Sequence, residues 1–198
     1  VKYFDNKAYL AQSPQFYKQM AIASGIERVF EVAPAFRAEN SNTNRHCTEF
    51  TSFDVEFAYI DSYKDVMELE VIVPDKIPRI KLEDLLKELN KRYGYVIPDG
   101  DIGDMNAETE KLAYKYAMEE YNSEFIFVTD FKKEKRAFYH MRDENNIPLG
   151  YDLIWRGMEI TTGAQREHRY DILKNQAKEK GLGRDVEFYL EFFKYGCP

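Results

Sequence analysis

The chain has 198 residues and a net charge of −7 at neutral pH, and 44% of its residues are hydrophobic and 15% aromatic. This composition is typical of a globular protein with a sizeable core and argues against an intrinsically disordered chain. The negative charge argues against a surface that coats nucleic acid through phosphate contacts. Any nucleic acid would have to bind at a small local site rather than across the whole surface.

Nothing in the sequence indicates a membrane protein or a secreted one. No apolar run approaches the roughly 20 residues of a membrane helix, and the N-terminus has no signal-peptide pattern. The two cysteines, Cys47 and Cys197, have no metal-ligand spacing and fit a reducing compartment. We therefore expect a cytoplasmic protein with no membrane partner.

The first predicted elements are a short strand at residues 8–12 and a helix that follows it. Ser13 is a favoured N-cap, Pro14 is a favoured first helical residue, and Gly25 suits the end of the helix. Two polar side chains of this helix are i, i+3 neighbours on one face and can hold a small polar molecule, although a lone lysine is more often solvated. The polar residues at this turn are Gln12, Ser13, Gln15 and Lys18.

Residues 28–37 and 48–60 both alternate between two faces, and the polar loop at 38–46 joins them. This pattern predicts a long antiparallel hairpin with one face in the core and the other forming a site. The site face is small and polar, as a floor that admits a ligand would be. Its residues are Glu31, Ala33, Ala35 and Arg37 on the first strand and Phe50, Ser52, Asp54, Glu56 and Ala58 on the second.

The rest of the chain mixes helices and strands without regular alternation, which predicts an α+β domain with an antiparallel β-sheet flanked by helices. The acidic run at 98–108 resembles a calcium loop only loosely and is predicted to be a solvated loop. The predicted helices span residues 61–70, 82–89, 108–121, 169–180 and 185–195. The predicted strands span residues 125–128, 136–141 and 151–162, the last interrupted at Gly157.

The loop of the hairpin and its two flanking strands carry groups suited to a nucleotide. The planar guanidinium of Arg37 can bind phosphate oxygens, and Glu39, Arg45 and His46 lie on a loop that can close over a polyphosphate. For Arg37 alone, a surface ion pair is an equally good interpretation. Phe50 favours the nucleotide, because a ring on a polar face is poorly placed unless a flat group stacks on it, which is worth about 1–3 kcal/mol for a base.

A second set of polar residues follows in the strand region around Gly157. The carboxylates of Asp152 and Glu159 and the hydroxyl of Thr162 are hard oxygen ligands of the kind that magnesium takes. Strict alternation places the two carboxylates, seven residues apart, on opposite faces. The chain must therefore turn or bulge at Arg156-Gly157 if both are to bind one ion. The alternative is a solvated strand face.

Three stretches of this chain, in order, resemble the class II aminoacyl-tRNA synthetases, and among them the aspartyl-tRNA synthetases of the archaeal and eukaryotic cytosolic type. FRAE at 36–39 and the spacing from His46 to Phe50 resemble the second signature motif of the family. AYLAQSPQFYKQM at 8–20 resembles its aspartate-binding segment, and GMEITTGAQR at 157–166 resembles its strand with a metal-binding Glu and a substrate-reading Arg.

The resemblance implies activation of L-aspartate by ATP with Mg²⁺, and transfer of the aspartyl group to tRNA(Asp) alone or also to tRNA(Asn). Arg37 would be the catalytic residue at the α-phosphate. The implied ATP-binding residues are Arg37, Glu39, Arg45, His46, Phe50 and Glu159. The implied aspartate-binding residues are Gln12, Ser13, Gln15, Lys18 and Arg166, and the implied metal ligands are Asp152, Glu159 and Thr162.

The resemblance further implies a homodimer in which residues 1–198 are part of the catalytic domain. An anticodon-binding domain and the first motif are expected before Val1, the last motif after Pro198, and a missing segment between Glu70 and Val71. Three alternatives stay open: an asparaginyl-tRNA synthetase, a paralogue that makes asparagine from aspartate, and a non-catalytic synthetase-like protein. Lys18 favours aspartate, because a buried ammonium gains no ion pair from a neutral amide.

Overall fold

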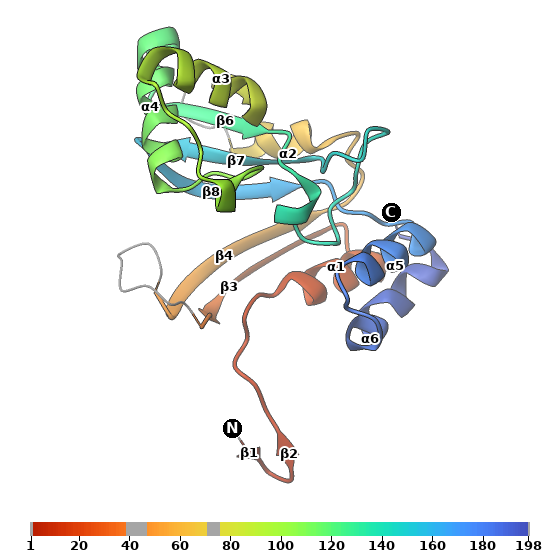
Figure 1. The fold of residues 1–198 in the computed structure, drawn as a ribbon. Helices are drawn as coiled ribbons and strands as arrows, with labels where there is room; N and C mark the ends of the chain where they lie inside the picture. Colours follow the sequence, from red (N-terminus) through yellow and green to blue (C-terminus); the bar gives the residue numbers. More distant parts are fainter. Residues whose placement is uncertain (1, 39–46, 71–75, 198) are drawn as a thin grey trace. The chain divides into compact units, whose positions relative to one another are not determined.

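In the computed structural model the described residues are 2–38, 47–70 and 76–197, and they form two compact units (Figure 1). The first, which we call the hairpin unit, comprises Val1–Tyr59 and Gly183–Pro198, and the second, the sheet unit, comprises Ile60–Leu182. None of the helices in the described part of the chain is long and apolar enough to span a lipid bilayer.

The hairpin unit is built on two long antiparallel strands, β3 and β4, with the helix α1 packed against both of them. Its elements are β1 (Lys2–Tyr3), β2 (Asn6–Lys7), α1 (Gln15–Ala23), β3 (Arg28–Phe36), β4 (Glu49–Phe57), η3 (Arg184–Val186), α6 (Glu187–Leu190) and η4 (Glu191–Tyr195). The predicted hairpin and its two faces are confirmed by the register. The residue pairs of the polar face are Ala35–Phe50, Ala33–Ser52, Glu31–Asp54 and Val29–Glu56.

The other face of this hairpin was expected to be core, and that expectation is wrong for the described chain. Phe30 is 73% exposed and Phe53, in the strand opposite, is 69% exposed. The physical reason is that α1 packs on the polar face, where Lys18 pairs with Asp54. Alternation along a strand shows that its two faces differ, but it does not show which face a helix will cover.

The sheet unit contains a four-stranded sheet with the order β5-β6-β7-β8. The pairs β6–β7 and β7–β8 are antiparallel, whereas β5 and β6 are parallel because two helices connect them. Its elements are α2 (Tyr63–Glu70), β5 (Arg79–Lys81), α3 (Leu82–Tyr93), η1 (Asp99–Asp101), α4 (Ala107–Tyr121), β6 (Phe125–Thr129), η2 (Lys133–Lys135), β7 (Gly150–Trp155), β8 (Met158–Ala164) and α5 (Tyr170–Glu179).

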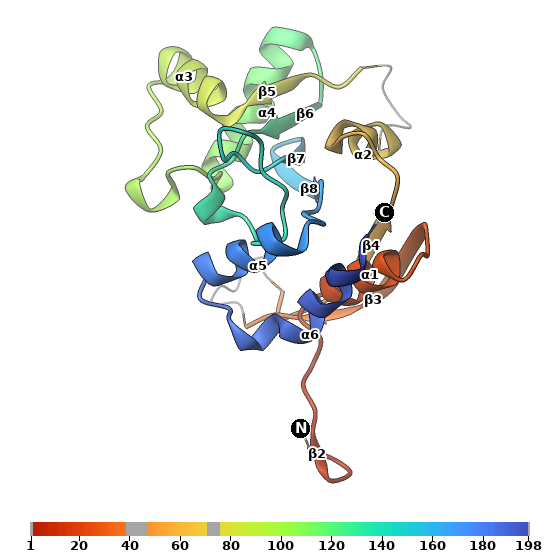
Figure 2. The same ribbon diagram turned by 90° about the vertical axis from the view of Figure 1, so that its right-hand side faces the viewer.

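The sheet is the middle layer of this unit (Figure 1, Figure 2). On one face, Ile126 and Ile154 pack against buried leucines and alanines of α3 and α4. On the other face, Phe127 and Tyr151 pack against Met67 of α2. Both faces of the central strands are therefore buried. The predicted α+β class, with helices flanking a mainly antiparallel sheet, is confirmed.

Three predicted elements are wrong. Residues 8–12 form no strand, although Ala11 O accepts one bond from Phe36 N. Residues 136–141 are not a strand either, because the side chain of Gln176 in α5 donates to the carbonyls of Phe138 and His140. The helix predicted at 185–195 is broken into η3, α6 and η4.

Candidate functional site

The helix α1 buries an amide and an ammonium against the polar face of the hairpin. Lys18 is 4% exposed, and its Nζ lies 3.0 Å from Asp54 Oδ1 and 3.6 Å from Glu56 Oε2. Gln15 is also buried, and its Nε2 donates to Gln19 Oε1 at 2.9 Å and to Glu56 Oε2 at 3.2 Å. The structure therefore brings together two of the predicted aspartate-binding residues and adds two carboxylates as their partners.

The two other predicted residues of this segment lie at the start of α1. Gln12 is exposed. Ser13 Oγ accepts a hydrogen bond from Gln15 N at 3.2 Å. The predicted N-cap is one residue off, because Pro14 is the N-cap and Gln15 is the first residue of α1. Ser13 also lines a small hollow whose floor includes Ala33 and Ala35 and whose wall includes Asp54. The hollow has a volume of only about 10 Å³, roughly the space of one water molecule, so a floor that admits a ligand stays a prediction.

Arg37 and Phe50 lie next to each other at the loop end of the hairpin. The guanidinium carbon of Arg37 is 5.0 Å from the centroid of the Phe50 ring, a cation–π contact. Arg37 is exposed, and its backbone N–H donates to Thr48 O at 3.0 Å. The remaining predicted nucleotide-binding residues of this loop, Glu39, Arg45 and His46, lie outside the described residues. Val71, at the predicted chain break, does so as well.

The required turn at Arg156-Gly157 is present. Both residues have positive φ, 49° and 79°, and they join β7 to β8. Asp152 lies opposite Thr162, and Ile154 lies opposite Glu159 after a register shift at Leu153/Ile154. The hairpin and its bulge together place the two carboxylates and the threonine hydroxyl on one face of the sheet. The turn that a shared magnesium site requires is therefore present, and the magnesium site itself stays a prediction.

An arginine that sequence reasoning placed on a strand, with no role, lies against these residues. Arg136 grips Asp152 with two bonds, Nη2 to Oδ2 at 2.5 Å and Nη1 to Oδ1 at 3.0 Å. Its Nη2 lies 3.6 Å from Asp104 Oδ1, and its guanidinium carbon lies 3.7 Å from the centroid of the Phe131 ring. The Asp152 side chain is only 3% exposed, so this pairing neutralises a buried charge.

Negative charge collects around Glu159. Glu159 keeps contact with solvent, but its backbone N–H donates to Glu110 Oε2 at 3.0 Å. Desolvation by the surrounding protein, followed by the charges of Asp152, Glu110 and Asp104, raises the pKa of Glu159 to about 8, against the opposing effect of Arg136. Sequence reasoning missed Asp104 and Glu110. Asp104 lies in the acidic loop predicted to be solvated, and Glu110 has an ordinary helical position, so no local signal marked either one.

The last predicted aspartate-binding residue, Arg166, belongs to the sheet unit, whereas Gln12, Ser13, Gln15 and Lys18 belong to the hairpin unit. Arg166 pairs with His140 in an isolated β-bridge, and its guanidinium carbon lies 5.5 Å from the centroid of the Tyr139 ring. His140 is 8% exposed, and its Nδ1 has no hydrogen-bond partner among the described residues.

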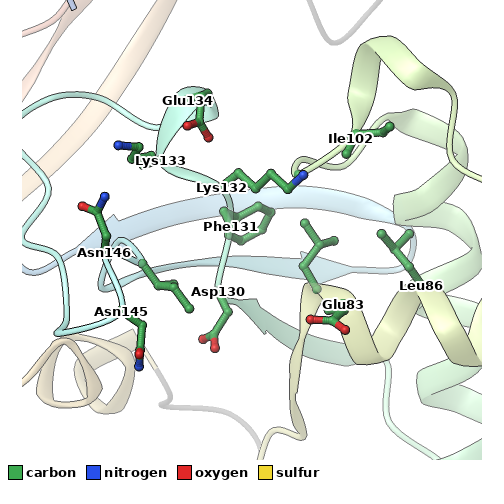
Figure 3. A pocket seen from close by; sticks show the side chains of 13 residues that line it. Glu83, Leu86, Ile102, Asp130, Phe131, Lys132, Lys133, Glu134, Asn145 and Asn146 are labelled. Atoms are coloured by element: carbon green, nitrogen blue, oxygen red, sulfur yellow. The ribbon is translucent and has the colours of Figure 1, made fainter. Parts of the chain in front are cut away.

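The sheet unit also contains a cavity of about 570 Å³ that none of the predicted site residues lines. It lies beside the start of α3 and the segment that follows β6, and Figure 3 shows Phe131 in its wall with Lys132 extending toward Ile102. Its apolar wall consists of Leu82, Leu86, Ile102, Phe131 and Ile147. Phe131 thus contacts both this cavity and the guanidinium of Arg136.

The chain is similar to known proteins over its full length. It is 42% identical to the aspartate–tRNA(Asp/Asn) ligase of Aeropyrum pernix and 41% identical to the aspartate–tRNA(Asp) ligase of Pyrococcus abyssi, in each case over 100% of this chain and 51% of the relative. It therefore spans about half the length of these curated relatives.

Two solved structures have the same fold. An aspartyl-tRNA synthetase from Entamoeba histolytica has a TM-score of 0.85 at 32% identity and covers 96% of this chain and 45% of its own. An asparaginyl-tRNA synthetase from Pyrococcus horikoshii, complexed with asparaginyl-adenylate, has a TM-score of 0.83 at 32% identity. The match covers 100% of this chain and 51% of that structure's chain. The profile of the tRNA synthetases class II (D, K and N) matches residues 1–198, and the chain belongs to this family.

Proposed function

We propose that the protein containing this chain is an aspartate–tRNA ligase. It activates L-aspartate with ATP to aspartyl-adenylate and transfers the aspartyl group to the 3′ end of tRNA(Asp), with tRNA(Asn) as a second acceptor to be tested. The observation that carries this proposal is the buried ammonium of Lys18, 3.0 Å from Asp54. The names of the relatives, including both the Asp-specific and the Asp/Asn forms, support it.

The charged groups around Lys18 suit an amino acid with a second carboxylate. The ammonium of Lys18 lies within reach of two carboxylates, those of Asp54 and Glu56. The side-chain carboxylate of aspartate can pair with Lys18, and its α-ammonium can pair with the carboxylate that Lys18 then leaves. Gln15 lies beside Lys18, and Ser13 and Gln12 lie at the start of the same helix. The role of Arg166 in binding aspartate remains a proposal from the resemblance.

The end of the hairpin suits ATP. Adenine can stack on Phe50 once the guanidinium of Arg37 leaves the ring, and because Arg37 is exposed this movement breaks no buried contact. Arg37 can then bind the α-phosphate and stabilise the charge that develops there. Glu39 at the adenine edge and Arg45 and His46 at the outer phosphates remain proposals from the resemblance.

The chemistry needs positioning rather than a protein nucleophile. An oxygen of the aspartate carboxylate attacks the α-phosphorus, the bond to the bridging oxygen breaks, and pyrophosphate leaves. A terminal ribose hydroxyl of the tRNA then attacks the aspartyl carbonyl, AMP leaves with the bonding electrons, and the proton of the hydroxyl passes to the departing phosphate. The role of Arg37 at both steps is to offset negative charge on the α-phosphate.

The face that carries Asp152, Glu159 and Thr162 fits Mg²⁺ by its donor chemistry. All three side chains offer hard oxygen ligands, and the neighbouring carboxylates of Asp152, Glu110 and Asp104 add to the desolvation that raises the pKa of Glu159. Within the described residues no three His, Cys, Asp or Glu side chains are grouped to hold a metal, so the proposed site combines two carboxylates with the hydroxyl of Thr162. Bound magnesium would neutralise charge on the triphosphate.

The rest of the protein enters the proposal through the resemblance. Residues 1–198 would be part of the catalytic domain, with an anticodon-binding domain and the last signature motif in the remainder, in a cytoplasmic homodimer. An asparagine-specific enzyme or an asparagine-making paralogue is not favoured, because the curated relatives quoted above act on aspartate by name and Lys18 would face a neutral amide.

The test is aminoacylation by the full-length protein with aspartate or asparagine, on tRNA(Asp) and on tRNA(Asn). We expect charging with aspartate only. Charging with asparagine, or formation of free asparagine without tRNA, would contradict the proposal. The two tRNAs then decide whether the enzyme serves one acceptor or both.

A further inference from the structure

Arg136 is more buried than an arginine of an ordinary surface ion pair. Its side chain is 14% exposed, and it meets the 3% exposed side chain of Asp152 through both oxygens of that carboxylate. Such a two-bond grip occupies the two oxygen atoms that a divalent cation would take from Asp152. Nη1 also lies 3.5 Å from the hydroxyl of Thr162, so the guanidinium touches two of the three proposed metal ligands.

The position of the guanidinium is fixed from other sides as well. It lies over the ring of Phe131, and its Nη2 lies 3.6 Å from Asp104. Its Nε is buried and has no hydrogen-bond partner among the described residues. A donor without a partner leaves this guanidinium able to form another bond, for example to an anionic oxygen.

The positive charge of Arg136 weakens the binding of a divalent cation that arrives without a nucleotide. The carboxylates of Asp152 and Asp104 are direct neighbours of Arg136, and the positive charge of Arg136 also acts on Glu159. A divalent ion at Asp152 would lie within a few ångströms of a guanidinium that cannot lose its proton, and the two positive charges would repel each other. A triphosphate that binds together with the ion supplies anionic oxygens. These oxygens can pair with the guanidinium and offset its repulsion from the cation.

We propose that Arg136 is a positioning residue that takes the cation's place at Asp152 in the free protein, so that a divalent cation binds weakly alone and tightly only together with a nucleotide polyphosphate. This inference rests on the proposed function, since it needs the metal site at Asp152, Glu159 and Thr162. It assigns to Arg136 the coupling between two ligands rather than a contact with the reacting atoms.

The test measures Mn²⁺ binding by electron paramagnetic resonance in the full-length protein, with and without α,β-methylene-ATP, whose α–β bridge cannot be cleaved. In the wild type, the dissociation constant of Mn²⁺ from the protein should fall at least tenfold when the ATP analogue is present. Mn²⁺ bound to the free analogue is measured separately and subtracted. In Arg136→Gln, Mn²⁺ alone should bind at least tenfold more tightly than in the wild type, and the effect of the analogue should fall by a similar factor.

Two further variants keep the test decisive. Arg136→Lys keeps the charge but cannot span both oxygens, so we expect about threefold tighter binding of Mn²⁺ alone, and this variant replaces Arg136→Gln if the latter does not fold. Arg142→Gln is the control, because Arg142 is similarly buried in the same unit but pairs with Glu179 at 2.7 Å. It should bind Mn²⁺ as the wild type does.

The outcomes separate this inference from the proposed function. If the wild type binds Mn²⁺ with the analogue but both Arg136 variants leave the binding of Mn²⁺ alone unchanged or weaker, Arg136 is a structural partner of Asp152 and the inference is wrong. If the wild type takes up no Mn²⁺ even with the analogue, the proposed metal site fails and the inference fails with it.

Discussion

The ammonium of Lys18 lies 3.0 Å from a carboxylate oxygen of Asp54, on a helix that covers the polar face of a two-stranded hairpin. The lysine is 4% exposed, so its charge depends on partners inside the protein. A buried ammonium of this kind can discriminate between an acid and its amide, because only the acid offers it a matching charge.

Replacing Lys18 by leucine should therefore remove aspartate activation. We expect kcat/KM for aspartate to fall at least 100-fold in ATP–pyrophosphate exchange, while KM for ATP changes less than threefold. The variant should also lose up to about 3–5 kcal/mol in free energy of unfolding, because Asp54 and Glu56 are left without their ammonium. Lys64→Leu, at an exposed lysine of α2, is the control, and unchanged exchange in Lys18→Leu would rule out the role given to Lys18.

The contact between Arg37 and Phe50 gives the opposite pattern. Phe50→Leu keeps an apolar side chain but loses the flat ring, so KM for ATP should rise about 5- to 150-fold, the equivalent of about 1–3 kcal/mol of stacking. KM for aspartate should stay within threefold. Phe53→Leu is a matched control on the same strand, since residue 53 lies on the opposite face. Equal effects of the two substitutions would show that Phe50 does not stack on the base.

The turn between β7 and β8 can be tested through its glycine. Gly157 has φ 79°, and a Cβ there would lie 3.1 Å from the backbone Cα of Lys111. Gly157→Ala should therefore lower the free energy of unfolding by at least about 1–2 kcal/mol, measured by urea denaturation. Gly100→Ala is the control, because a Cβ at Gly100 meets nothing within 4 Å. A Gly157→Ala protein as stable as the control would mean that the turn relaxes without strain.

His140 predicts a pH dependence of stability. Burial first, and then the positive charges of Arg166, Arg136 and Arg142, lower the pKa of His140 well below its usual 6.5. Below pH 6.5 the unfolded chain takes up a proton at this residue that the folded chain does not, so stability falls as pH falls from 6.5 toward the folded pKa.

The measurement is urea denaturation of the wild type and His140→Gln between pH 7.5 and 5.5. Each pH unit below the unfolded pKa should destabilise the wild type by up to about 1.4 kcal/mol more than the variant. Parallel stability curves for the two proteins would show that His140 is protonated in the folded state.

The parts of the fold that the sequence predicted well depend on local patterns. Alternation along 28–37 and 48–60 gave the hairpin and its two faces, and the demand that Asp152 and Glu159 share a face gave the turn at Gly157. Both inferences use only neighbours along the chain, and side-chain direction in a strand follows from such neighbours.

The parts that the sequence did not predict depend on contacts between distant segments. The grip of Arg136 on Asp152 joins residues 16 apart in the chain through a segment that resembles a strand but is held by Gln176 of α5. The choice of α1 to cover the polar hairpin face likewise depends on Lys18 finding Asp54, 36 residues away. Secondary-structure propensity and periodicity describe neighbours along the chain and not partners that are distant in sequence. The charge network of the site could therefore be found only from the three-dimensional structure.

The exposed aromatic face of the hairpin has a consequence for the behaviour of residues 1–198 in solution. Phe30 and Phe53 pack side by side with ring centroids 6.4 Å apart, and Val32 and Val55 extend the same apolar surface. A contiguous apolar surface of this kind drives self-association. A purified 1–198 fragment should therefore bind a hydrophobic dye such as ANS and show a sedimentation coefficient that rises with concentration, and Phe53→Lys should reduce both.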